Sequence, residues 1–308
     1  MNILKTLCAI HAPSGEEFRV KEFLIDYVNS AKYWWTKKPK LVYGNSFQDN
    51  LLLVYGKPKI AFIAHTDTVG YTVRYNKELI PIGTPVSETG WRLQGEDEIG
   101  KIDCILHKNS DEYNLSYIYK RLIKSGTSLT FKADFKNEDE YIQSPYLDNR
   151  LGVWLLLKLA EEMKQGVLAF TTHEEHGGGS VAYVVKHLYE KYGIRQYIIV
   201  DTTYTTEGIF HDKGVVISLR DEYIPRKLFV DKIIKTALEG NVKFQLEVEQ
   251  SGSSDGACVQ KSPYPVDWCF VGPPISNIHS PDEIINKNDI FAALKIYRLL
   301  MQKLQSNY

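Results

Sequence analysis

The sequence predicts an α/β protein built on a mixed, largely parallel sheet that helices cover on both faces, with a small β-rich module inserted into it. Two observations support this prediction. Short apolar runs typical of buried strands, such as 60–64 and 167–172, alternate with longer segments of helical periodicity, such as 149–165. Between residues 71 and 143 the pattern changes to short runs rich in Tyr, Thr, Ile and Gly, without a long amphipathic helix. Alternating strands and helices favour a sheet with helices on both sides.

The composition excludes several classes of protein. The chain has 308 residues and a formal net charge of -1, with a pI near 6.7, so it offers no electrostatic basis for binding nucleic acid or a membrane surface. No apolar run reaches the roughly 18 residues that a transmembrane helix needs, and the N-terminal segment lacks the apolar core of a signal peptide. The four cysteines are scattered without a CxxC pair, which is typical of buried thiols in a reducing compartment. We therefore expect a soluble, cytoplasmic protein.

Residues 1–70 are predicted to form the first part of the main domain. A short helix is followed by a break at residues 12–15, where Ser14 is positioned to cap a second helix over residues 16–30. Three strands follow, over residues 38–44, 50–56 and 59–67. The last of them is a buried-strand pattern that ends in His65 and Asp67.

Residues 71–143 are predicted to form the inserted β-rich module, and residues 144–308 the second part of the main domain, in which strands and helices alternate again. The predicted helices span residues 149–165, 180–192, 226–238, 254–261 and 282–305. The predicted strands span residues 167–172, 195–200, 214–220, 243–248 and 266–271.

Polar side chains gather where the predicted strands end and where the central helix begins. The set comprises His65, Asp67, Asp148, Glu174, Glu175, Asp201 and His279. Ligands bind at this edge of an open α/β sheet, and two adjacent glutamates are costly to desolvate without a positive partner. Nitrogen and oxygen donors without a thiolate suit zinc, cobalt or manganese. A shared carboxylate with one histidine and one acid on each side is the usual provision for two metal ions about 3.5–4 Å apart.

Each of these residues also has a simpler structural interpretation when it is taken alone. Asp148 is a typical helix N-cap, and Glu174 and Glu175 could simply be exposed residues of a solvated loop. His65 is more distinctive, because Asp67 lies two residues further on the same face of the strand, where it can orient a ligating imidazole. The convergence of the whole set at one edge favours the metal site.

Several segments, taken in order, resemble the di-metal aminopeptidases of the tetrahedral-aminopeptidase and glutamyl-aminopeptidase family. They are AHTDTVG, YLDNRLG, THEEHGGGS, IIVD and SNIHSPDE, together with HAPSGEE and SGSSDGACVQ. The resemblance spans residues 10–290. The resemblance implies two divalent metal ions per chain, zinc first and cobalt or manganese as alternatives. It implies that His65 and Asp201 hold one ion, that Glu175 and His279 hold the other, that Asp148 bridges them, that Glu174 is the general base and that Asp67 orients His65.

The same resemblance carries further expectations. It implies that the inserted module is a PDZ-like dimerisation domain, so the protein would be a homo-oligomer, and that the bond between Asp148 and Asn149 is cis. The implied activity is removal of the N-terminal residue from peptide substrates. The residues leave two alternatives open: a di-metal amidohydrolase acting on N-acyl amino acids, or a binding protein that has kept the fold and lost activity. The groups that meet a free amine or a carboxylate of the substrate are not evident in the sequence.

Overall fold

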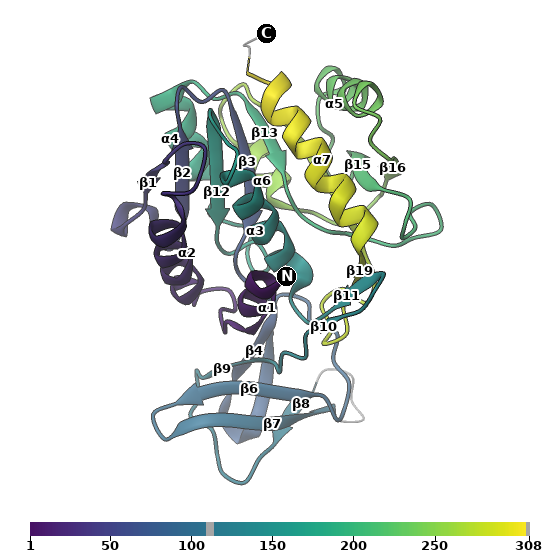
Figure 1. Ribbon diagram of the computed structural model, residues 1–308. Helices are drawn as coiled ribbons and strands as arrows, with labels where there is room; N and C mark the ends of the chain where they lie inside the picture. Colours follow the sequence, from purple (N-terminus) through teal and green to yellow (C-terminus); the bar gives the residue numbers. More distant parts are fainter. Residues whose placement is uncertain (109–113, 306–308) are drawn as a thin grey trace.

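The computed structural model describes residues 1–108 and 114–305, and an eight-stranded sheet forms the centre of the main body (Figure 1). The strand order is β1-β2-β12-β3-β13-β17-β15-β16. The bounds are β1 Lys40–Val42, β2 Leu51–Tyr55, β12 Gly166–Thr171, β3 Ile60–His65, β13 Gln196–Ile199, β17 Asp267–Gly272, β15 Val215–Arg220 and β16 Phe244–Val248. The pairs β12–β3, β3–β13, β13–β17 and β15–β16 are parallel, and the other three are antiparallel. The predicted mixed, largely parallel α/β sheet is confirmed.

The central strands are buried along their whole length because alternate residues enter two different cores. In β3, Phe62 belongs to a core that includes residues of α1, α2, α3, α5 and α7, whereas Ile63 belongs to a second core with residues of α4 and α6. The helices are α1 Asn2–Ala9, α2 Phe18–Ala31, α3 Leu147–Ala160, α4 Val181–Tyr192, α5 Lys227–Glu239, α6 Asp255–Lys261 and α7 Lys287–Lys303. Because α3 is buried along almost its entire length, it lies at the centre of the first core.

A closed barrel of six strands, in the order β4-β5-β8-β7-β6-β9, projects from one end of the main body close to α1 (Figure 1). The strands are β4 Gly70–Val73, β5 Glu78–Ile82, β8 Leu115–Ile118, β7 Gly100–Lys108, β6 Arg92–Asp97 and β9 Ser128–Phe131. Inward-facing residues such as Leu93, Leu129 and Phe131 form a third, separate core. The barrel therefore has its own hydrophobic interior.

Several short elements complete the fold: one 3-10 helix lies between β1 and β2, another lies between β4 and β5 of the barrel, and two small sheets lie outside the large sheet and the barrel. The 3-10 helices η1 and η2 span Asn45–Phe47 and Tyr75–Lys77, and β14 Thr203–Tyr204 pairs with β18 Pro274–Ile275. Strands β10 Lys136–Asn137 and β11 Tyr141–Gln143 form a small sheet with β19 Ile284–Asn286, which directly precedes α7. Residues 136–143 are thus outside the barrel and pair with a strand that comes much later in the chain.

Two local predictions were wrong. The last helix begins at Lys287 rather than at residue 282, because Ile284 pairs with Gln143 in β11 and is held in a strand. Ser14 does not cap the second helix, which begins at Phe18. Its hydroxyl instead donates a hydrogen bond to Asp67 at 2.6 Å.

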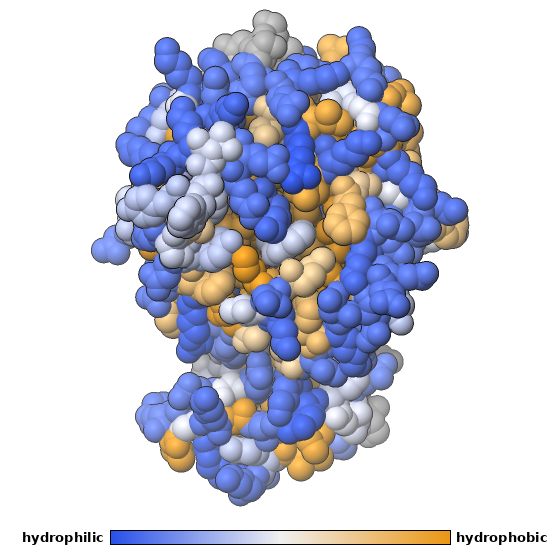
Figure 2. Space-filling view, in the orientation of Figure 1, coloured by the Kyte–Doolittle hydropathy of each residue, from blue (hydrophilic) through white to orange (hydrophobic). Residues whose placement is uncertain are grey.

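Figure 2 shows a mainly hydrophilic face, with hydrophobic residues visible in the middle of the main body and on the barrel. None of the helices described is long and apolar enough to cross a membrane. All four cysteines are free thiols, and three of them are buried as expected, whereas Cys258 is half-buried.

Candidate metal centre

The seven polar residues singled out in the sequence come together at one edge of the large sheet. Strands β12, β3 and β13 are parallel neighbours, and Thr171 at the end of β12 is in register with His65 at the end of β3. The residues that follow these strands, Glu174 and Asp201 among them, therefore emerge at the same edge. Asp148 reaches this edge from the first turn of α3, and His279 from the loop between β18 and β19.

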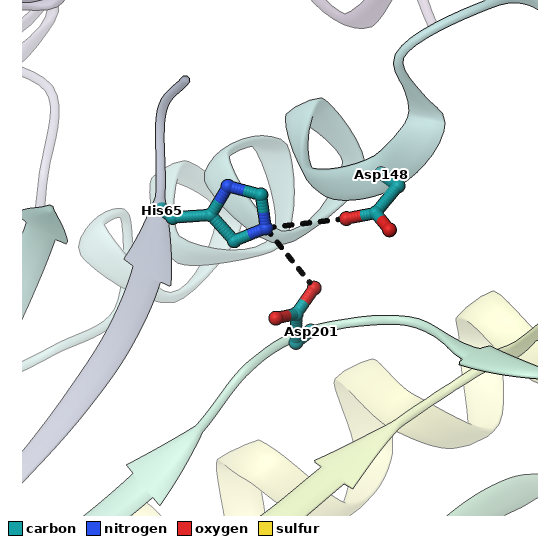
Figure 3. A group of neighbouring side chains, drawn as sticks. All are labelled: His65, Asp148 and Asp201. Atoms are coloured by element: carbon teal, nitrogen blue, oxygen red, sulfur yellow. Dashed lines mark hydrogen bonds and ion pairs between the residues drawn. The ribbon is translucent and has the colours of Figure 1, made fainter. Parts of the chain in front are cut away.

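The first group of side chains comprises His65, Asp148 and Asp201, which point toward one another from a strand end, a helix start and a loop (Figure 3). The Nε2 atom of His65 lies 3.2 Å from Oδ1 of Asp148 and 3.5 Å from Oδ1 of Asp201. All three residues are buried. One imidazole nitrogen and two carboxylates thus share a small, enclosed space.

The second group comprises Asp148, Glu175 and His279. The Nε2 atom of His279 lies 3.1 Å from Oε2 of Glu175 and 3.5 Å from Oδ2 of Asp148. Asp148 therefore presents one carboxylate oxygen to each histidine. Glu174 belongs to neither group, and its Oε2 lies 4.0 Å from Nε2 of His65.

The electrostatics of the centre favour positive charge at the two imidazoles. Burial acts to lower the pKa of His65, but Asp201, Asp148 and Asp67 outweigh burial and hold it well above its usual range. Burial also acts to lower the pKa of His279, but the carboxylates of Glu175 and Asp148 outweigh burial and raise this pKa to about 12. Burial raises the pKa of Asp201 to about 7. A potential that stabilises protons on both imidazoles also favours a divalent cation between the same atoms.

The donors that converge here fit divalent metal ions. They are nitrogen and oxygen atoms only, a set of donors that suits zinc, cobalt or manganese. Oε1 of Glu175 is buried and has no hydrogen-bond partner among the described residues. Such an atom is costly unless a cation or water satisfies it. Because two groups share Asp148, the arrangement suits metal binding on both sides of that carboxylate.

Asp67 holds the segment that carries the two glutamates. Its Oδ1 accepts the backbone N–H of Glu174 at 3.1 Å, and its Oδ2 accepts the backbone N–H of Glu175 at 3.0 Å. Nδ1 of His65 lies 3.5 Å from Oδ1 of the same carboxylate. Burial acts to raise the pKa of Asp67, but its hydrogen bonds and the neighbouring His65 outweigh burial and lower it, so the group is a carboxylate. Asp67 thus connects a histidine of the centre to both glutamates.

Glu283 is a buried residue of the site that the sequence analysis did not single out. Its Oε2 accepts the backbone N–H of Asp148 at 3.1 Å, and its Oε1 accepts the backbone N–H of His279 at 2.9 Å. It is 1% exposed. Glu283 therefore holds together the two backbone segments that carry Asp148 and His279. The only sequence signal was its position four residues after His279 in SNIHSPDE, which an ordinary loop glutamate can also occupy.

Close backbone approaches around Asp201 and Asp148 require glycine. A Cβ atom on Gly272 would lie 1.6 Å from the backbone oxygen of Asp201, and one on Gly152 would lie 2.1 Å from Oδ1 of Asn149. Asn149 in turn donates a hydrogen bond to the backbone oxygen of Val200 at 2.8 Å. The peptide bond between Asp148 and Asn149 is cis, as the resemblance implied.

Known proteins share this fold over nearly the whole chain. A TET aminopeptidase from a marine sediment archaeon of the Thaumarchaeota superposes with a TM-score of 0.85 at 16% identity, covering 99% of this chain and 97% of that one. An aminopeptidase from Desulfurococcus kamchatkensis gives 0.85 at 19% identity, covering 98% and 94%. A TET peptidase from Pyrococcus horikoshii, described as assembling into a tetrahedron or a large octahedral shell, gives 0.80 at 22% identity, covering 97% and 98%.

The family comparison, together with the fold and the converging carboxylates and imidazoles, defines a peptide hydrolase. The family model for M42 glutamyl aminopeptidases matches residues 117–296, more than half of the chain. This protein belongs to the M42 glutamyl aminopeptidase family. Peptidases of this family are metal-dependent, and the two groups around Asp148 are the candidate ligands.

Proposed function

We propose that this protein is a metallo-aminopeptidase that removes the N-terminal residue from peptides by means of two divalent metal ions, zinc foremost, with Glu174 as the general base. The observation that carries the proposal is the position of Asp148. Its two carboxylate oxygens face two histidines, and each histidine is paired with a further acid. A shared carboxylate of this kind is the usual basis of a two-metal hydrolase.

The proposed ligands divide into two sets around Asp148, which bridges them. His65 and Asp201 complete one set, and Glu175 and His279 complete the other. When bound, the ions would supply Lewis-acid polarisation of the scissile carbonyl and would acidify water. Asp67 orients His65 and the glutamate segment, and Glu283 fixes the backbone beneath Asp148 and His279. These contacts restrict the movement of the ligand atoms, which favours a preformed centre.

Glu174 is proposed as the base because it is close to the centre without belonging to either ligand group. Its carboxylate lies 4.0 Å from His65, whereas that of Glu175 lies 3.1 Å from His279. The two adjacent carboxylates lie near different histidines, so one glutamate can bind while the other faces the attacking water. Glu174 would accept a proton from that water and pass it to the leaving amine.

The proposal is tested with matched pairs of substrates. Protein loaded with zinc, cobalt or manganese is assayed on aminoacyl amides and on the same compounds with an acetylated amine. An aminopeptidase cleaves the free amines and leaves the acetylated partners intact. Preferential cleavage of the acetylated compounds would instead identify the amidohydrolase that acts on N-acyl amino acids. Cleavage of neither series would contradict both forms of the proposal.

We further propose that the barrel is the counterpart of the PDZ-like dimerisation domain of the family and mediates self-association. Ile105 in β7 and Ile118 in β8 lie directly opposite each other, and they are 41% and 55% exposed. Adjacent exposed apolar residues favour a contact surface. Light scattering should give a multiple of 35.3 kDa for the intact chain, and Ile118→Lys should reduce this mass. Ile224→Lys, at a residue of the main body that is 60% exposed, is the control. A monomeric wild-type protein would contradict the proposal.

A further inference from the structure

The candidate metal centre opens into a cavity of about 580 Å³. His65, Asp148, Glu174 and His279 lie on its wall, so a substrate held at the centre extends into this space. The cavity continues past Thr203 to Asp221 just after β15, to Glu247 in β16 and to the loop before α6. Its chemistry therefore bears on which N-terminal residue the site accepts.

The cavity wall carries four carboxylates in addition to those of the metal centre and the base: Asp221, Glu247, Glu249 and Asp255. Among the described residues that line it, Lys261 is the one lysine or arginine, and its ammonium group lies over the ring of Tyr223 at 4.6 Å. Arg220 lies behind this wall, where its Nε–H donates to the backbone oxygens of Asp221 and Glu249. Negative charge therefore exceeds positive charge within the cavity.

The hydrogen-bond partners recorded for these carboxylates are neutral. Glu247 accepts from the Thr203 hydroxyl, and Asp221 accepts from the backbone N–H of Tyr223 at 2.6 Å. Glu249 is half-buried and has no recorded side-chain hydrogen bond or ion pair among the described residues. Hydroxyl and amide donors do not balance the charge of buried carboxylates.

Asp255 provides an independent sign that the cavity binds a ligand. It is 2% exposed, and one of its oxygens accepts from the Thr171 hydroxyl at 2.7 Å. Its other oxygen, Oδ1, is buried and has no hydrogen-bond partner in the part of the chain that the structure describes. A buried carboxylate oxygen without a donor is stabilised when a cation or a donor group enters the cavity.

Apolar side chains also line the wall. Ala257, Phe270 and Ile278 line the same cavity as the four acids. A long aliphatic stem that ends in a positive charge can contact both kinds of surface, and lysine and arginine have such side chains. A glutamate side chain would bring a further negative charge among the acids, although the family is described as glutamyl aminopeptidases.

We propose that this cavity selects peptides whose N-terminal residue is lysine or arginine and disfavours those that begin with glutamate or aspartate. This inference rests on the proposed aminopeptidase function and assigns its substrate class. Asp221, Glu247 and Glu249 would meet the cationic end of the side chain, and the apolar wall would contact its stem.

The first experiment compares fluorogenic amides of lysine, arginine, norleucine, leucine and glutamate with the metal-loaded protein at fixed ionic strength. Norleucine is the important control, because it keeps a linear aliphatic stem and lacks the charge. We expect kcat/KM for lysine and arginine to exceed that for norleucine by at least about 10-fold, with glutamate the poorest substrate. Equal cleavage of norleucine and lysine, or a preference for glutamate, would overturn the inference while leaving the aminopeptidase function intact.

The second experiment removes one charge. Glu249→Gln, at a residue without recorded side-chain partners, should lower the ratio of kcat/KM for lysine over norleucine several-fold, mainly through KM. Glu207→Gln makes the same change at an exposed glutamate outside the cavity and should leave the ratio as in the wild type. An unchanged ratio in both Glu249→Gln and Asp221→Asn would overturn the assignment.

A binding measurement separates this inference from the proposed function. Calorimetry with lysinamide and norleucinamide on the metal-loaded protein reports on the cavity even if no amide is cleaved. Tighter binding of lysinamide supports a cation-selective cavity, and equal binding overturns it. Absence of cleavage of every fluorogenic amide would contradict the aminopeptidase function, and the calorimetry would still decide whether the cavity selects a cationic side chain.

Discussion

Replacement of Asp67 by asparagine tests whether the centre depends on a residue that is not proposed to bind metal. Each oxygen of Asp67 accepts a different backbone N–H, that of Glu174 at 3.1 Å and that of Glu175 at 3.0 Å. An asparagine has only one oxygen, and its NH2 group cannot accept a hydrogen bond. In either orientation of the amide, at least one backbone N–H therefore faces another donor.

The size of the effect follows from these contacts. Loss of a hydrogen bond to a charged group, together with a buried donor left unpaired, costs about 2–4 kcal/mol. Ser14→Ala is the matched control: it removes the hydroxyl that donates to Asp67 and leaves both backbone contacts, so its cost should be about 1 kcal/mol. We expect Asp67→Asn also to weaken metal binding roughly 10–100-fold, as is typical for residues that orient a ligand.

The assay is urea unfolding in the presence of a chelator, combined with titration of metal into the folded variants. Because the folded-state pKa of Asp67 is lowered, its contribution is present above the ordinary aspartate pKa of 3.8 and is lost as pH falls through the lower folded value. The difference in unfolding free energy between wild type and Asp67→Asn should therefore persist at neutral pH and diminish below pH 3.8. A difference at neutral pH no larger than that of Ser14→Ala would refute this reasoning.

The remaining predictions concern the metal ligands, the base and one glycine. Asp148→Ala should remove all bound metal as measured by elemental analysis, since this carboxylate faces both histidines, and full retention would exclude a bridging role. Glu174→Gln should keep the metal while kcat falls about 10²–10⁴-fold, whereas the activity of Glu175→Gln should partly return at high metal concentration; the reverse pattern would exchange the two roles. Gly272→Ala should lower the free energy of unfolding by about 1–3 kcal/mol and reduce metal content, because its Cβ would lie 1.6 Å from the backbone oxygen of Asp201. A Cβ atom on Gly208 would lie no closer than 4.0 Å to its nearest neighbour, so Gly208→Ala should leave thermal unfolding unchanged. Equal effects of Gly208→Ala and Gly272→Ala would contradict the steric argument.

The architecture of the main body could be predicted because local periodicity reports burial directly. The run that contains Phe62 and Ile63 is apolar at every position, and such a run fits a strand buried on both faces. The ends of such strands meet at one edge of a parallel sheet, so the proximity of His65, Glu175 and Asp201 followed from their positions alone. The start of the last helix was predicted less well, because Ile284 has helical spacing but pairs with Gln143 in a distant strand.

The sequence by itself determined the strand and helix pattern, the nitrogen and oxygen donors and the edge at which they meet, because these depend on residue type and on periods of a few residues. Tertiary structure alone decided which carboxylate accepts which backbone N–H. Ser14 is a residue type typical of helix caps, but its hydroxyl donates to Asp67. Glu283 is a residue type typical of loops, but its carboxylate accepts the backbone N–H groups of Asp148 and His279. Tertiary structure likewise decided that Asp221 and Glu249, which directly follow β15 and β16, line the cavity beside the centre. Contacts between residues far apart in the chain depend on how whole elements pack, so a local sequence pattern does not predict them.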